Sequence, residues 1–361
     1  MSNGVQERHL ISPYLIFTVL YVSMVGVGVL SFQKELMKHA GYNSWISVLL
    51  MGGSIHIVIW MIYKIMSSHQ GLDVTSIHQA CFGKLLGFLL NLGLAVYFFS
   101  SAFIEFRTYL HVIQVWVFPV MKVWPLSILI AALIYYTVSG GFRSVAALSF
   151  WGLMLTIFFI IPQILLVLPY AHPQNLLPLF NHSIIDIMHS TKSMLFQFMG
   201  IEALLLFYPF IRTPEKSQKW AHFAVLFTTG LYLVILTLTF MYFSEGQLRK
   251  IIWPTLSMIM IFEVPVLQRL EYLAISVWII KIIANISLSI WVACRVMKNS
   301  LRIRPRLSLL GILAGILVLT IWVKDSDRIH WFSESYQTVG LYFIYGYIPL
   351  LFVVTQVKKN H

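Results

Sequence analysis

Ten apolar stretches run along the chain, each long enough to cross a lipid bilayer. A transmembrane helix needs about 20 apolar residues to span about 30 Å of hydrocarbon. The first five stretches are Pro13–Ser31, Ser44–Tyr63, Leu85–Phe106, Val123–Ser139 and Val145–Leu168. The second five are Asp186–Phe210, Ala221–Phe243, Tyr272–Cys294, Leu307–Val323 and Tyr336–Val357. This pattern predicts an all-α polytopic membrane protein with ten transmembrane helices, packed as one transmembrane domain over residues 1–361.

One further apolar run, Ile251–Leu267, differs from these ten. It contains Pro254, Glu263 and Pro265. Proline removes a backbone hydrogen bond, and lipid offers no partner to the group that is freed. We therefore expect a re-entrant or interfacial helix pair here rather than an eleventh span.

Two spans carry a break signal near their centres. The first span contains Ser-Met-Val-Gly-Val-Gly at residues 23–28, and the sixth contains Phe-Met-Gly-Ile-Glu at residues 198–202. Interrupted helices at corresponding positions of two halves are typical of transporters built from inverted repeats. Because five spans is an odd number, the second set begins on the opposite side of the membrane. The pattern predicts a five-plus-five inverted repeat, with repeat one at about 12–168 and repeat two at about 186–357.

Composition narrows the class of protein. Hydrophobic residues make up 59% of the chain and charged residues only 11%, which excludes an ordinary soluble enzyme. Cys81 and Cys294 lie in separate segments without metal-ligand spacing, and His56 and His111 lack a carboxylate-rich partner set. Nucleophile-elbow, zinc-hydrolase and phosphate-loop motifs are absent. We expect no catalytic residue, no metal site, no cofactor and no enzymatic activity.

The basic residues predict the orientation. With a cytoplasmic N-terminus, 14 of the 25 Lys and Arg residues lie on the inner side and eight on the outer side. Positively charged loops favour the cytoplasm, so both termini are expected there. The basic residues behind the net charge of +12 are then expected to face the anionic lipids of the membrane. No nucleic-acid partner is expected, because the loops are too short to form a basic domain. The first span also lacks the pattern of a cleaved signal peptide.

Several short motifs, spread through the whole chain, resemble those of one family. They are Ile252-Trp253-Pro254-Thr255, Phe262-Glu263, Gln268-Arg269-Leu270-Glu271, Trp278-Ile279-Ile280, Phe103-Ile104-Glu105-Phe106-Arg107, Gly140-Gly141, Gly200-Ile201-Glu202-Ala203 and Tyr208-Pro209. In this order and spacing the sequence resembles the B subunits of Ger-type nutrient germinant receptors, the spore germination permease family of endospore-forming bacteria. One departure is Leu30-Ser31, where the family commonly has Leu-Pro after the glycines of span one.

The resemblance implies both a fold and a function. The implied fold is similar to that of amino acid–polyamine–organocation transporters, a LeuT-like five-plus-five repeat with helices one and six broken. The implied function is that of a membrane subunit of a nutrient germinant receptor, which binds a small germinant, typically an amino acid, and triggers germination. The implied partners are an A subunit and a lipoprotein C subunit in the spore inner membrane. The alternative is a proton- or sodium-coupled amino acid transporter.

Fold analogy also indicates a ligand site at the two breaks. A ligand carboxylate would meet N–H groups near the glycines of span one, and a ligand ammonium would face carbonyl groups of the break in span six. Aromatic side chains would cover the remainder of the ligand. The expected ligand-binding residues are Ser23, Gly26, Gly28, Tyr97, Phe198, Gly200, Glu202 and Trp278.

Five charged residues fall within or at the edge of spans: Glu105, Arg107, Lys192, Glu202 and Lys281. A charge at the centre of a membrane helix costs about 2.5–3.5 kcal/mol. We expect Arg107 and Lys192 to lie near the outer interface and to extend to water. Glu202 follows a break, where it can receive a ligand ammonium, hydrogen-bond freed N–H groups or bind a proton. We expect Lys281 either to substitute for a bound cation or to pair with Glu202 or Glu105.

Overall fold

The computed structural model describes residues 6–69, 72–260 and 270–359. Within these residues, seven helices are long and apolar enough to cross a membrane, or up to eight if the bent pair Ile184–Phe198 and Ile201–Phe210 forms one span. Two shorter apolar helices, Leu15–Met24 and Val123–Ser139, occupy the positions of predicted spans one and four. Each of the ten predicted spans therefore corresponds to apolar helix in the structure.

The elements of the first half begin with a short 3-10 turn before span one. They are η1 (Glu7–His9), α1 (Leu15–Met24), η2 (Val27–Leu30), α2 (Phe32–Ala40), η3 (Gly41–Ser44), α3 (Trp45–Ser68), α4 (Val74–Trp116), α5 (Val123–Ser139), α6 (Phe142–Leu155), the π-helix η4 (Thr156–Ile160) and α7 (Ile161–Leu165). The 3-10 turns η5 (Leu168–Tyr170) and η6 (Pro173–Leu176) connect the halves.

The second half starts with the bent sixth span. Its elements are α8 (Ile184–Met194), η7 (Leu195–Phe198), η8 (Ile201–Ala203), α9 (Leu204–Phe207), η9 (Tyr208–Phe210), α10 (Pro214–Tyr242), α11 (Glu245–Lys250), α12 (Pro254–Ile259), α13 (Leu270–Leu301), α14 (Pro305–Trp322), α15 (Ser326–Tyr342), the π-helix η10 (Phe343–Tyr347) and α16 (Ile348–Lys359). The two parts of the sixth span are bent by 48°.

Local sequence explains where several helices begin. α10, α12 and α14 start at Pro214, Pro254 and Pro305, and proline suits the first helical position because the N–H it lacks would have no partner there. α8 begins after Ser183, whose side chain and that of Asp186 form a reciprocal capping box. The chain therefore marks these helix starts with local signals.

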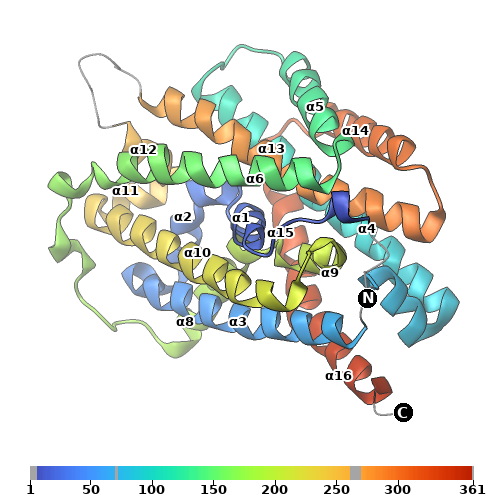
Figure 1. Ribbon diagram of the computed structural model, residues 1–361. Helices are drawn as coiled ribbons and strands as arrows, with labels where there is room; N and C mark the ends of the chain where they lie inside the picture. The colour runs from blue at the N-terminus through green and yellow to red at the C-terminus, as the bar shows by residue number, and fades with distance from the viewer. Residues whose placement is uncertain (1–5, 70–71, 261–269, 360–361) are drawn as a thin grey trace.

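Helix α1 lies in the interior of the bundle. Its residues are apolar on all sides, and eight of its ten residues are buried; a helix with this composition is stable only when surrounded by protein or lipid. Figure 1 shows α1 between α6 on one side and α10 on the other, and α13 also contacts it. α3 packs against α10, and α4 packs along α13. The neighbours of α1 thus come from both halves.

The start of the first broken span and the end of the sixth are joined on the side of the N-terminus. The N–H of Ile11 donates to the carbonyl of Phe210 at 2.8 Å, and the N–H of Arg212 donates to the carbonyl of Ile11 at 3.0 Å. Arg143, at the start of α6, donates to the carbonyl of Arg8 at 2.9 Å. These bonds hold the segment before α1 against the end of the sixth span and the start of α6.

The run Ile251–Leu267 does not form a span where the structure describes it. It contains the six-residue helix α12, which begins at Pro254 and contacts α10, α7 and η2. Glu263 and Pro265 lie outside the described residues. The short helix fits the prediction that this run does not cross the membrane.

Arg107 corrects one prediction. Its side chain does not extend to water, since it is only 1% exposed. Nε donates to the carbonyl of Val323 at 2.7 Å, and Nη2 donates to the carbonyl of Lys324 at 3.0 Å. The reason is that α14 ends here and leaves carbonyl groups without helical partners. Lys192 is exposed, as expected.

We predict that Arg107→Leu lowers the stability of the chain, because two carbonyl groups at the end of α14 lose their donors. Leaving such groups unsatisfied costs about 1–3 kcal/mol each. The measurement is the melting temperature of the purified chain in detergent. The matched control is Lys192→Leu at an exposed position, and equal melting temperatures for the two variants would contradict the assignment.

Candidate functional site

The first break lies between α1 and η2. Helix α1 ends at Met24, and Gly26 adopts an extended conformation. The freed N–H of Val27 donates to Oε2 of Glu105, on α4, at 2.9 Å. A Cβ atom at Gly26 would overlap the carboxylate of Glu105. Glycine at position 26 therefore lets the carboxylate approach the backbone there.

The carbonyl groups at the end of α1 are bound by side chains from two other helices. Nδ2 of Asn285, on α13, donates to the carbonyls of Val22 and Ser23 at 2.8 and 3.2 Å. The hydroxyl of Tyr232, on α10, donates to the carbonyl of Met24 at 3.2 Å. The break is thus stabilised by α4, α10 and α13 together.

The second break is organised by Glu202. Gly200 has φ +105°, a left-handed conformation that strongly favours glycine. Its N–H donates to the two carboxylate oxygens of Glu202 at 3.0 and 2.9 Å, and the hydroxyl of Tyr97 donates to Oε1 at 2.7 Å. Glu202 is fully buried. Of the three roles left open by the sequence, the structure shows hydrogen bonding to a freed N–H group.

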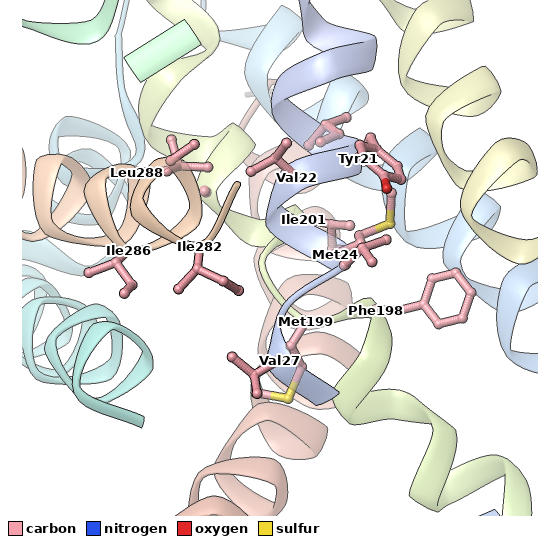
Figure 2. Packing of buried hydrophobic residues seen from close by; sticks show 14 of the residues in the cluster. Tyr21, Val22, Met24, Val27, Phe198, Met199, Ile201, Ile282, Ile286 and Leu288 are labelled. Atoms are coloured by element: carbon pink, nitrogen blue, oxygen red, sulfur yellow. The ribbon is translucent and has the colours of Figure 1, made fainter. Parts of the chain in front are cut away.

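The two breaks contact each other in the middle of the bundle. Figure 2 shows Met24 and Val27 of the first break close to Phe198, Met199 and Ile201 of the second, and η2 contacts η7. A Cβ atom at Gly200 would lie 2.6 Å from the carbonyl oxygen of Ser23. The small residue therefore also permits this close approach.

A cavity, which we call the polar cavity, lies between the two breaks and has a volume of about 20 Å³, room for about one water molecule. It is lined by Ser23, Met24, Gly26, Gly28, Ser101, Ile104, Glu105, Phe196, Gln197, Met199, Asn285 and Tyr336. Four residues singled out from the sequence meet there: Ser23, Gly26, Gly28 and Glu105. The polar cavity is the candidate ligand site.

The other expected ligand-binding residues do not line the polar cavity. Tyr97 and Glu202 are bonded to each other beside it, and Gly200 lies against Ser23. The ring of Phe198 packs 5.8 Å from that of Tyr232.

Trp278 belongs to a second cavity, which we call the apolar cavity. Its lining is Val29, Leu30, Tyr109, Val112, Thr156, Ile160, Ile164, Leu231, Ile235, Thr255, Leu256, Ile259, Ala274, Ile275 and Trp278. Val29 and Leu30 belong to η2, while Gly28 of the same turn lines the polar cavity. The turn η2 therefore contributes to both cavities.

Lys281 forms neither of the expected ion pairs. It is 1% exposed, and no hydrogen-bond partner reaches its amine within the described chain. Nζ lies 4.0 Å from the ring centre of Trp278 and 5.1 Å from that of Tyr21. Glu202 is already bound by Tyr97 and Gly200, and Lys281 interacts with Glu105 only at longer range, without direct contact. The alternative prediction, that Lys281 substitutes for a bound cation, stays a prediction.

Four polar residues of the site were missed in the sequence: Ser101, Gln197, Asn285 and Tyr336. Two carried a usable signal, because residues one helical turn apart share a face. Ser101 precedes Glu105 by one turn, and Asn285 follows Lys281 by one turn. Gln197 and Tyr336 carried no comparable signal, since their place depends on how η7 and α15 pack.

A bundle with two broken helices that enclose a polar cavity has the architecture of a secondary transporter. The solved structure of a Na⁺-coupled sialic acid symporter matches with a TM-score of 0.71 and 12% identity, over 96% of this chain and 78% of that one. Mhp1, a nucleobase-cation-symport-1 family transporter, matches with a TM-score of 0.63 and 11% identity, over 96% and 77%. These likenesses confirm the predicted LeuT-like fold.

Within this fold class, the chain belongs to the spore germination protein family, whose model matches residues 10–329. It is 37% identical over 353 residues to the spore germination protein GerQB of Bacillus cereus, with 96% of each chain covered. It is 22% identical to spore germination protein A2 of Bacillus subtilis strain 168, over 94% of this chain and 93% of the relative. The resemblance found in the sequence is confirmed.

We predict that Gly26→Ala destabilises the chain, because its Cβ overlaps the carboxylate of Glu105. Overpacking of this kind costs about 1–3 kcal/mol. Adding Glu105→Ala removes the overlapping group, so the double variant melts at a higher temperature than Gly26→Ala alone. Gly53→Ala is the control, since no atom lies within 4 Å of a Cβ there. If the double variant melts no higher than Gly26→Ala alone, the assigned contact between position 26 and Glu105 is wrong.

We also predict that Glu202→Gln lowers the melting temperature. The new amide group places a donor where the N–H of Gly200 or the hydroxyl of Tyr97 already donates, and hydrogen bonds to charged groups contribute about 1.5–3 kcal/mol. Glu245→Gln is the control, because Glu245 is exposed and pairs with Arg249 at 2.6 Å on the surface. If Glu202→Gln lowers the melting temperature no more than Glu245→Gln does, Glu202 has no structural role.

Proposed function

We propose that this chain is the membrane subunit of a nutrient germinant receptor, and that it binds a small germinant, an amino acid, in the polar cavity to trigger spore germination. Membership in the spore germination protein family supports a role in spore germination. One structural observation carries the proposal of a binding site: both helix breaks contribute to a single cavity, and the carboxylate of Glu105 lines it.

The same proposal includes partners and location. The receptor contains an A subunit and a C subunit besides this chain, and it lies in the spore inner membrane with both termini of this chain in the cytoplasm. Family membership supports the partners and the membrane. The excess of Lys and Arg on the side of the termini supports the orientation.

Signalling requires a conformational change, because the polar cavity has room for about one water molecule. A germinant enters only when the elements around the cavity separate. The bonds of Ile11 to Phe210 and Arg212 hold the ends of the two broken spans together on the side of the termini. Opening of the cavity toward that side would break them. A germinant shifts the balance between two states by the difference in its affinity for them.

A proton- or sodium-coupled amino acid transporter is the second candidate. The observation in its favour is the LeuT-like fold, shared with solved cation-coupled transporters. Uptake of radiolabelled L-alanine into proteoliposomes that contain the purified chain separates the candidates. The receptor proposal predicts no concentrative uptake with either a proton or a sodium gradient. Sustained concentrative uptake would favour the transporter.

We predict that Ser101→Leu, which fills the polar cavity, raises the germinant concentration for half-maximal germination by about tenfold or more, equivalent to about 1.4 kcal/mol. The measurement is the loss of optical density of spores at a series of germinant concentrations, with equal amounts of the chain verified by immunoblot. Ser67→Leu, at an exposed position of α3, is the control. If both variants respond like the wild type, the polar cavity is not the germinant site.

A further inference from the structure

The charge of the polar cavity indicates which chemical class of ligand it accepts. Resting on the proposed function, we propose that Glu105 is the residue that determines this class. The cavity takes a ligand that presents a cationic amine to Glu105, and it disfavours a ligand that presents an anion there. The proposal reverses the orientation expected from the sequence, in which a ligand carboxylate meets the N–H groups of the first break.

One oxygen of Glu105 is left without a donor. Oε2 accepts the N–H of Val27 at 2.9 Å. Among the described residues, no group donates a hydrogen bond to Oε1. The side chain is partly exposed, in contrast to the fully buried Glu202, and it lines the polar cavity. A carboxylate in such a place is stabilised by a further donor, and the cavity is where that donor has room to bind.

No basic residue in the described part of the chain forms an ion pair with Glu105. The guanidinium of Arg107, on the same helix, is bound to carbonyl groups at the end of α14. The amine of Lys281 lies over the rings of Trp278 and Tyr21. It forms no hydrogen bond to a carboxylate, and its charge interacts with that of Glu105 only at longer range. Within the described residues, no cation is therefore in direct contact with Glu105, and a ligand ammonium can take that place.

The remaining lining is uncharged. Its polar side chains are Ser23, Ser101, Gln197, Asn285 and Tyr336, and the others are apolar or glycine. Glu105 thus provides the only formal charge among the residues that line the polar cavity. A cleft with one sign of charge attracts ligands of the opposite sign and repels those of the same sign.

A carboxylate of a ligand has no comparable place at the first break. The N–H of Val27 is already bound to Glu105, and the carboxylate of Glu105 lies directly beside Gly26. An anionic ligand group would have to displace a carboxylate that is covalently part of the chain, and it would then lie close to a like charge. An amino acid would therefore bind with its ammonium group, not its carboxylate, at this break.

The test uses charged reagents, so it does not depend on knowing the germinant. The chain contains two cysteines, Cys81 and Cys294, which are replaced by serine. Ser101→Cys then places one thiol in the lining of the polar cavity. The full-length chain in lipid nanodiscs is treated with cationic aminoethyl methanethiosulfonate or anionic sulfonatoethyl methanethiosulfonate. Labelling rates are measured by intact mass, relative to Gln174→Cys at an exposed position.

We expect the cationic reagent to label Ser101→Cys at least about tenfold faster than the anionic one, after correction with the exposed control. Adding Glu105→Gln removes the preference, and adding Glu105→Asp, which keeps the charge, retains it. Equal rates for the two reagents, or a preference that persists in Glu105→Gln, would overturn the inference while leaving the polar cavity as the germinant site. No labelling by either reagent even after prolonged incubation would instead overturn the proposed function, because that function requires the elements around the cavity to separate and admit small solutes.

Discussion

Two interrupted helices in an apolar bundle leave backbone groups that lipid cannot satisfy, and the rest of the structure depends on how these groups are bound. At the first break Glu105 accepts an N–H, while Asn285 and Tyr232 donate to carbonyls. At the second break Glu202 accepts the N–H of Gly200. These bonds connect α1 to α4, α10 and α13, and two of these helices, α4 and α13, contribute residues to the lining of the polar cavity.

The two carboxylates at the breaks differ in what remains available to a ligand. Glu202 is fully buried, and its oxygens are already bound by Gly200 and Tyr97. Glu105 binds Val27 with one oxygen, its other oxygen accepts no hydrogen bond from the described residues, and its side chain lines the polar cavity. On the proposed function, a fold shared with transporters uses this carboxylate to sense an amine.

Much of the fold was predictable from the sequence, because membrane spans are a property of local composition and both breaks carry glycine. The site was predictable in part. Glu105 was found as a charge within a span, but its contact with Val27 depends on the packing of α4 against η2. The partners of Arg107 lie more than 200 residues away in the chain, at the end of α14. Local sequence patterns carry no information about such contacts.

The most direct test of the central claim is an electron cryo-microscopy map of the receptor with the germinant to which its spores respond. The account predicts ligand density in the polar cavity, between Gly26 and Gln197, with an amine or other donor group within hydrogen-bond distance of Glu105. Density confined to the apolar cavity beside Trp278, or an anionic group bound at Val27 in place of Glu105, would contradict it.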